Sequence, residues 1–249
     1  MPESLERSDS SLPASIMLAE HQRVSSLYLH NAAMGERRVT IHLLFVAGGG
    51  TLLLSLPQLM GLKPAADGSF FPIINQLILP GLVIVILMAV EGILTFQRLI
   101  ERRVRATEYL RAINRINRYF VDRSPELQQY LPWPSCDNMP AFGGKTLGVA
   151  DLRDLVAVLN CLYAGILGAD LSLLVLESLQ AGTYQGWIGL FAIALGLFVA
   201  MATWRWHSRY ETSIVQKAER EFAGRVAFPA SSAVAREAAV NLPGIEIDA

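Results

Sequence analysis

Apolar residues in this chain gather into four long stretches, which are separated by polar, arginine-rich segments. The stretches cover residues 39–62, 72–96, 155–179 and 186–204, and each is nearly free of charged side chains. A helix needs about 20 apolar residues to cross the ~30 Å hydrocarbon core of a bilayer, and each stretch approaches or exceeds that length. The pattern therefore predicts four transmembrane helices.

The composition agrees with this interpretation. Of the 249 residues, 52% are hydrophobic and 17% are charged, whereas an ordinary globular protein has roughly 25% charged residues. The mean hydropathy is +0.36. A soluble bundle with four fully buried helices would need amphipathic helices to cover them, and a chain of this length has too few. We therefore expect an all-α membrane protein that interacts with the lipid bilayer.

Basic residues show which side each loop faces. The segment 98–123 holds eight arginines, and six more Lys and Arg residues follow the fourth stretch, whereas the loops after the first and third stretches contain only Lys63. Cytoplasmic loops carry an excess of Lys and Arg. We therefore expect both termini and the central connection to be cytoplasmic, in a multi-pass protein of the bacterial inner (plasma) membrane.

The second stretch continues as helix beyond the membrane. Gly92 is the only Gly or Pro between residue 82 and Asp122, which predicts one helix of roughly 40 residues that ends at Ser124–Pro125. The chain is thus expected to comprise four transmembrane helices with long cytoplasmic helical extensions. The expected segments are a cytoplasmic lead-in (1–38), a first transmembrane hairpin (39–97), a cytoplasmic basic helix and loop (98–150), a second hairpin (151–206) and a cytoplasmic helix with a loose tail (207–249).

The cytoplasmic sequence YLRAINRINRYF has the clearest helical pattern. At 100° per residue its apolar residues form one stripe and three arginines occupy the opposite face. The stripe, expected to pack against a partner or another subunit, contains Tyr109, Ile113, Ile116 and Phe120; the basic face contains Arg111, Arg115 and Arg118. These arginines are either a solvated face that contacts anionic lipid headgroups or a gate that binds a phosphate-bearing nucleotide or oligonucleotide on the cytoplasmic side.

Asp170 is a carboxylate in the outer half of the third stretch. Facing lipid there would cost at least ~2.5 kcal/mol, so we expect it to face the bundle interior, another subunit or water. It is either a protonated, hydrogen-bonded side chain or part of an ion pathway. Glu177 lies two turns further on almost the same face. Together the two acids would form an acidic outer vestibule.

Three glycines, Gly48, Gly49 and Gly50, lie inside the first stretch. Small residues let membrane helices approach closely, so the run indicates either helix packing or a backbone that faces a pore. Two other polar residues are given lesser roles. Glu91 is expected to reach toward Arg98, and His42 is expected to lie at the membrane interface.

The sequence contains no pattern typical of an enzyme. It has no Ser/His/Asp grouping, no HExxH motif and no Cys/His cluster with metal-ligand spacing. We therefore expect no catalytic residues, no metal and no cofactor.

The outline of the chain resembles that of small multi-pass membrane effectors of bacterial antiviral defence, in which a basic cytoplasmic surface senses a nucleotide and the membrane part perturbs the inner membrane. The leading hypothesis is a homo-oligomeric channel or membrane-perturbing effector, with Asp170 and the glycine run in the pathway. One alternative is a non-conducting scaffold or accessory subunit that binds a partner protein in a larger membrane complex. Another is a small proton- or cation-coupled transporter.

Overall fold

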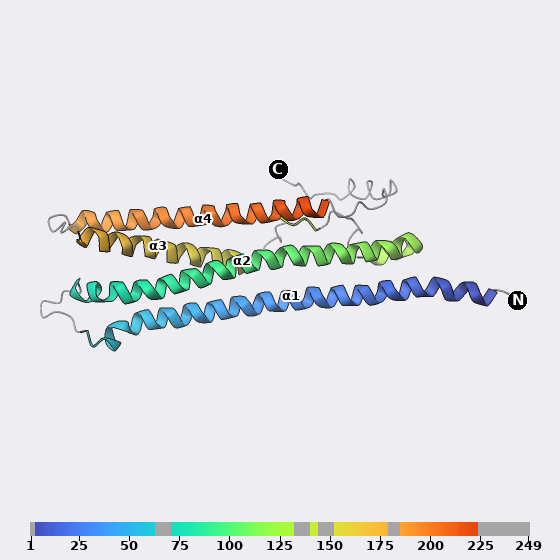
Figure 1. The fold of residues 1–249 in the computed structure, drawn as a ribbon, viewed down its shortest axis with the longest axis horizontal. Coiled ribbons are helices and arrows are strands. Elements are labelled where there is room, and N and C mark those ends of the chain that lie inside the picture. Colours follow the sequence, from blue (N-terminus) through green and yellow to red (C-terminus); the bar gives the residue numbers. More distant parts are fainter. Residues whose placement is uncertain (1–2, 63–70, 132–139, 144–151, 179–184, 224–249) are drawn as a thin grey trace. The chain divides into compact units, whose positions relative to one another are not determined.

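The computed structural model describes residues 3–62, 71–131, 140–143, 152–178 and 185–223, and within them all regular structure is helical. The elements are α1 (Glu3–Leu59), α2 (Phe71–Arg123), the short 3-10 helix η1 (Pro125–Tyr130), α3 (Leu152–Ser178) and α4 (Gln185–Ala223) (Figure 1). Among the described residues, four helices are long and apolar enough to cross a membrane. The all-α class and the presence of four helices suited to span a membrane are confirmed; the cytoplasmic extensions and the side on which each terminus lies stay predictions.

Helix α2 is 53 residues long, which confirms the expectation of one helix that continues far beyond its apolar stretch. It ends at Arg123, directly before the Ser-Pro step, where the amide of Ser124 still donates to the carbonyl of Phe120 at 2.9 Å. The residue before a proline is disfavoured in the helical region. The sequence signal and the helix end therefore coincide.

The chain folds into two units, and α1, α2 and α4 contribute residues to both. Unit 1 contains the described residues of 3–33, 102–143 and 215–223. Unit 2 contains those of 34–101 and 152–214. Unit 2 therefore holds most of the apolar sequence, and unit 1 holds most of the basic helix.

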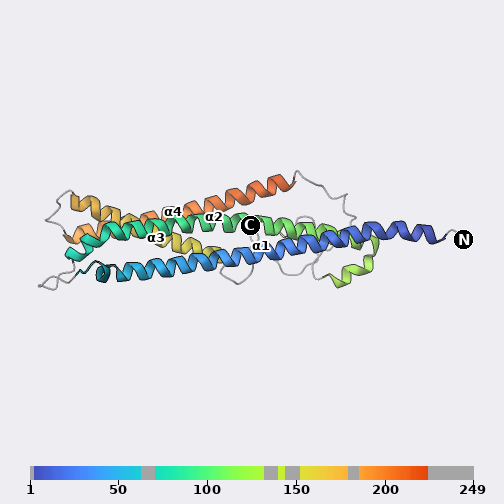
Figure 2. The same cartoon turned by 60° about the horizontal axis from the view of Figure 1, so that its bottom comes forward.

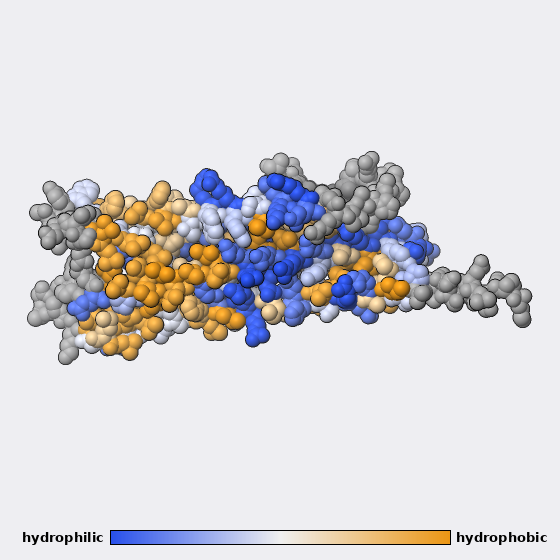
Figure 3. Space-filling model, in the orientation of Figure 1, coloured by the Kyte–Doolittle hydropathy of each residue, from blue (hydrophilic) through white to orange (hydrophobic). Residues whose placement is uncertain are grey.

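In unit 2 the four helices run side by side (Figures 1 and 2). One buried cluster joins α2 and α3 through Val85, Met88 and Tyr163, and α1 packs against it. A second joins α2 and α3 through Phe96 and Val156, and α4 packs against it. The visible face of unit 2 carries mainly apolar side chains (Figure 3), as expected for a surface that faces lipid.

Helices α3 and α4 approach each other backbone to backbone. A Cβ added at Gly196 would lie 2.7 Å from the carbonyl oxygen of Gly165, and one added at Gly168 would lie 3.0 Å from a methyl group of Val199. Small residues at such a crossing allow the close van der Waals contact that holds membrane helices together. Glycines in α3 and α4 therefore define the packing of the second hairpin.

Candidate functional site: a buried polar cluster

Polar side chains from all four helices are buried or partly buried within unit 2. They are His42 of α1, Glu91 and Thr95 of α2, Asn160 of α3 and His207 of α4; we call these five residues the polar cluster. His42 and Thr95 are fully buried, Asn160 and His207 are 2% exposed, and the Glu91 side chain is 24% exposed. Polar groups removed from water in this way need partners.

The first hairpin supplies one set of partners. His42 Nδ1 is paired with a carboxylate oxygen of Glu91. The other carboxylate oxygen of Glu91 accepts a hydrogen bond from the hydroxyl of Thr95, one turn further along α2, at 2.7 Å. Both oxygens of this acid are therefore engaged inside the bundle.

The second hairpin supplies another set. Asn160 Nδ2 lies 3.1 Å from His207 Nε2, and His207 Nδ1 lies 2.8 Å from the carbonyl oxygen of Thr203, one turn earlier in α4. The His207 ring also meets Phe96 of α2 edge to face, with the ring centroids 4.2 Å apart. This histidine is held by contacts with three helices.

The two sets meet at Gly92 of α2. A Cβ there would overlap the amide oxygen of Asn160 and would lie 3.3 Å from Cε1 of His42. The absence of a side chain at this position lets the amide and the imidazole reach the same point. Within the described chain, Asn160 Oδ1 and His42 Nε2 are buried without a hydrogen-bond partner.

One expectation from sequence is wrong here. Glu91 was expected to reach Arg98, but Arg98 instead lies 3.7 Å from Glu101, and Glu91 pairs with His42. His42 is fully buried within the bundle, and its expected place at the membrane interface stays a prediction. The partners are 49 residues apart in sequence, so the only local signal was a histidine and an acid near the same end of two predicted spans.

Asp170 lies on the buried face of α3. Seven-residue steps return to nearly the same side of a helix, and the residues one and two steps before Asp170 are Tyr163 and Val156, which are both buried. Within the described residues no hydrogen bond or ion pair reaches the Asp170 carboxylate. Its neighbour Ser172 donates instead to the backbone of Ala169, at 2.7 Å. Glu177 is one further step along this face in α3, and its side chain lies outside the described part of the chain.

The glycine run of α1 contributes to packing at one position. A Cβ at Gly49 would lie 2.6 Å from the sulfur of Met88 in α2, whereas Cβ atoms at Gly48 and Gly50 would meet nothing within 4 Å. Close packing between α1 and α2 thus explains Gly49. A pathway role for the three glycines stays a prediction.

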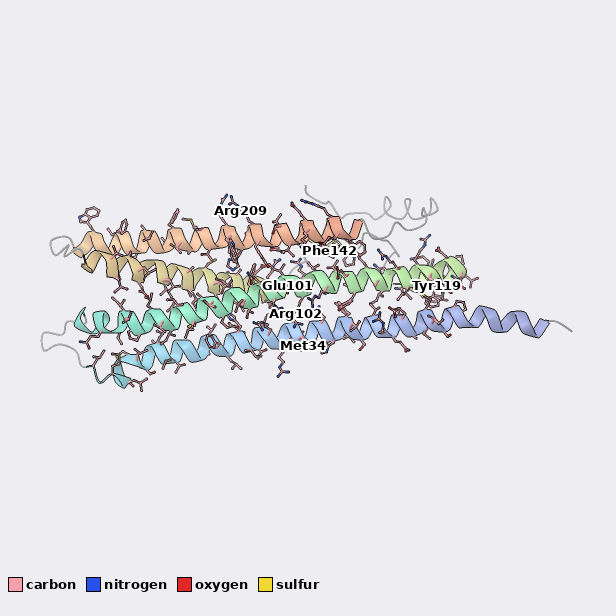
Figure 4. The ribbon with its side chains drawn as sticks, viewed as in Figure 1. Met34, Glu101, Arg102, Tyr119, Phe142 and Arg209 are labelled. Carbon is pink, nitrogen blue, oxygen red and sulfur yellow. The ribbon has the colours of Figure 1, made fainter. Side chains whose placement is uncertain are left out.

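Arg111 of unit 1 does not face outward, contrary to the expectation from helical periodicity. It is 3% exposed, and its guanidinium lies between the rings of Phe142 and Phe222, 4.1 and 4.6 Å from their centroids (Phe142 is labelled in Figure 4). It donates to the carbonyl of Pro140 at 2.9 Å and to the carboxylate of Glu219 at 3.2 Å. Arg111 therefore joins α2, the 140–143 segment and α4.

The other members of the basic face also have contacts inside unit 1. Arg115 lies 4.7 Å from the ring centroid of Phe222, and Arg118 forms an ion pair of 2.7 Å with Asp122 one turn later. Of the apolar stripe, Ile116 is buried, and Tyr109, Ile113 and Phe120 are partly buried. Roles in ligand binding for the arginines and in partner binding for the stripe stay predictions.

No protein-family model, curated protein sequence or solved structure matches this chain. Among the described residues, no three His, Cys, Asp or Glu side chains are grouped so that they could hold a metal ion. The polar cluster itself offers imidazole, carboxylate, hydroxyl and amide groups. Imidazole and carboxylate groups bind and release protons, and hydroxyl and amide groups orient them through hydrogen bonds.

Proposed function

We propose that this chain moves protons across a membrane, by a path that includes the polar cluster and follows the buried face of α3. The observation that carries the proposal is the convergence of two histidines and an acid, from three helices, inside the membrane-spanning unit. Ionisable side chains within transmembrane helices are rare, and they often mark proton relays or ion pathways. Histidine also changes its charge near physiological pH.

The buried face of α3 supplies a direction for the path. The path continues from Asn160 through Tyr163 and Asp170 to Glu177. Asn160 and Glu177 are 17 residues apart, which corresponds to a rise of about 25 Å along the helix. That rise is close to the ~30 Å thickness of the hydrocarbon core. With the predicted topology, the polar cluster would lie near the cytoplasmic end of the path and Glu177 near the outer end.

The buried Arg111 gives this proposal preference over a nucleotide-gated effector. A guanidinium enclosed by two aromatic rings and a carboxylate is not free to bind a phosphate. The apolar surface of unit 2 suits lipid or further copies of the chain, so a homo-oligomer fits the proposal. A path along α3 within one bundle does not require a pore on a shared axis.

The test is proton flux into liposomes that contain the purified full-length protein. A pH-sensitive dye inside the vesicles would report proton entry driven by a potassium diffusion potential. We expect flux above that of protein-free liposomes, loss of flux in Glu91→Gln, and reduced flux in Asp170→Asn. The matched control is Glu101→Gln, because Glu101 lies on the same helix and forms only an exposed pair with Arg98.

Three results would refute the proposal. They are no flux from the wild-type protein at any pH, flux from Glu91→Gln equal to the wild type, and currents carried by Na⁺ or K⁺ that do not depend on pH. The third result would make the chain a cation channel, in which Asp170→Asn should alter selectivity.

The second candidate function is a non-conducting scaffold, and one observation favours it. The polar cluster draws residues from all four helices, so its hydrogen bonds would also hold the bundle together in a subunit of a larger complex. A scaffold predicts no proton flux into liposomes, together with a large loss of thermal stability in Glu91→Gln.

A further inference from the structure

His207 is held in one tautomer. The carbonyl oxygen of Thr203 only accepts hydrogen bonds, so His207 Nδ1 at 2.8 Å must carry a hydrogen. In the neutral ring Nε2 is then bare and accepts a hydrogen bond, which Asn160 Nδ2 donates across 3.1 Å. The orientation of the Asn160 amide therefore corresponds to a neutral His207.

That orientation turns the amide oxygen toward the other histidine. Asn160 Oδ1 and His42 Nε2 are both buried without a partner, and both side chains reach the point above Gly92. An oxygen that accepts and a nitrogen that carries a hydrogen are complementary. His42 Nδ1 already faces the carboxylate of Glu91, so a hydrogen on Nε2 as well makes the ring an imidazolium. The amide orientation thus suits a charged His42 beside a neutral His207.

The reverse distribution of protons requires the reverse orientation. A proton on His207 Nε2 converts that atom from an acceptor into a donor, which opposes Asn160 Nδ2. A half-turn of the amide would bring Oδ1 to His207 and Nδ2 toward His42. The ring of His42 must then be neutral with a bare Nε2, because otherwise two donors would face each other in a buried site.

We propose that the side-chain amide of Asn160 is a two-position switch that couples the two histidines, so that a proton on His42 or His207 disfavours a proton on the other. Asn160 is thus a positioning residue. This inference rests on the proposed function, in which the switch would disfavour the state with both histidines charged. The coupling itself is an equilibrium property and is measured without transport.

Other charged groups lie around the two rings. Glu91 faces His42 from α2, and it is close enough to the phenol of Tyr163 in α3 to act on it electrostatically. Arg38 lies one turn before His42 in α1. The ion pair of Arg153 and Glu211 lies one turn beyond His207 in α4. Within the part of the chain that the structure describes, Asn160 is the side chain that both contacts His207 and shares the space at Gly92 with His42.

The experiment is histidine ¹⁵N NMR of the full-length protein in lipid nanodiscs, as a function of pH. The chain has four histidines, so His21→Gln and His30→Gln leave only the two rings of interest. In this background we expect the rings to become charged in two separate steps. Charging of both rings at a single midpoint would overturn the proposal. This test needs no substitution of Asn160.

A mutant cycle assigns the coupling to the amide. Replacing His42 by Phe should raise the proton affinity of His207 about fivefold or more, which is a midpoint shift of about 0.7 pH unit, because a charged His42 holds the amide in the orientation that opposes a proton on His207 Nε2. In an Asn160→Leu background the same replacement should shift the midpoint by much less. Equal shifts in the two backgrounds would mean that the coupling passes through space and not through Asn160.

The two proposals fail separately. If liposomes show no proton flux but the two histidines titrate in a coupled way, proton transport is refuted and the switch still stands. Proton flux with independently titrating histidines would refute the switch alone.

Discussion

Gly92 is the position where a small change should disturb the polar cluster most. In Gly92→Ala the new Cβ would overlap the amide oxygen of Asn160 and lie 2.9 Å from its Cγ, so the amide must move away from His207. Losing the partner of a buried polar group costs about 1–3 kcal/mol, and overpacking adds a similar amount. Alanine recovers about 1 kcal/mol of helix propensity. We expect a net loss of about 1–5 kcal/mol.

The assay is unfolding of the purified protein in mixed micelles by increasing SDS, followed by tryptophan fluorescence. Gly189→Ala is the matched control, because a Cβ at Gly189 of α4 meets nothing within 4 Å. It should leave stability unchanged or raise it slightly. Asn160→Ala provides the decisive background, because it removes the atoms that collide with the new methyl group.

In that background Gly92→Ala should cost much less than in the wild type. Distant, independent substitutions have additive effects, and contacting ones do not. The reasoning is refuted if Gly92→Ala is as costly in Asn160→Ala as in the wild type, or if it costs nothing in either.

Three further predictions concern other parts of the chain. Gly196→Val should separate α3 from α4 and lower the free energy of unfolding by about 1–3 kcal/mol, because the carbonyl of Gly165 lies 2.7 Å from the added Cβ. Disulfide cross-linking between engineered cysteines in α3 and α4 would detect the separation. Arg111→Lys should increase proteolysis within residues 140–143, because lysine cannot keep both the ring contacts and the bonds to Pro140 and Glu219. Asp170→Leu should raise stability against SDS while abolishing flux, because a half-buried carboxylate without a partner is costly.

Each of these has a control. Gly189→Val should be tolerated, since its Cβ would meet nothing nearby. The exposed Arg209 (Figure 4) should accept lysine without a change in proteolysis. For Asp170, a loss of stability on replacement by Leu would mean that the carboxylate has a stabilising partner after all.

The apolar helices and the C-terminal end of α2 were predictable because their causes are local. Apolar stretches longer than the membrane is thick and a Ser-Pro step after Arg123 are visible in the sequence, and both match the structure. The length of α2 followed from the lack of helix-breaking residues between Gly92 and Asp122.

The site was much less predictable, because its contacts join distant parts of the chain. Asn160 and His207 are 47 residues apart, and nothing in either local sequence indicates that they meet. Arg111 shows the same limit. Helical periodicity places it opposite the apolar stripe, but Phe142 and Phe222 cover that side of α2. A helical pattern identifies the faces of one helix and does not reveal what other segments bring to them.

The pairing within the polar cluster also bears on how the chain enters the bilayer during synthesis. His42 and Glu91 belong to the first hairpin, and Asn160 and His207 belong to the second. Each hairpin therefore carries partners for its own polar groups, which lowers the cost of inserting them as a pair of helices. Contact at Gly92 is needed only when the two hairpins dock. The two halves of the chain, produced as separate polypeptides, would each insert and then assemble in the membrane.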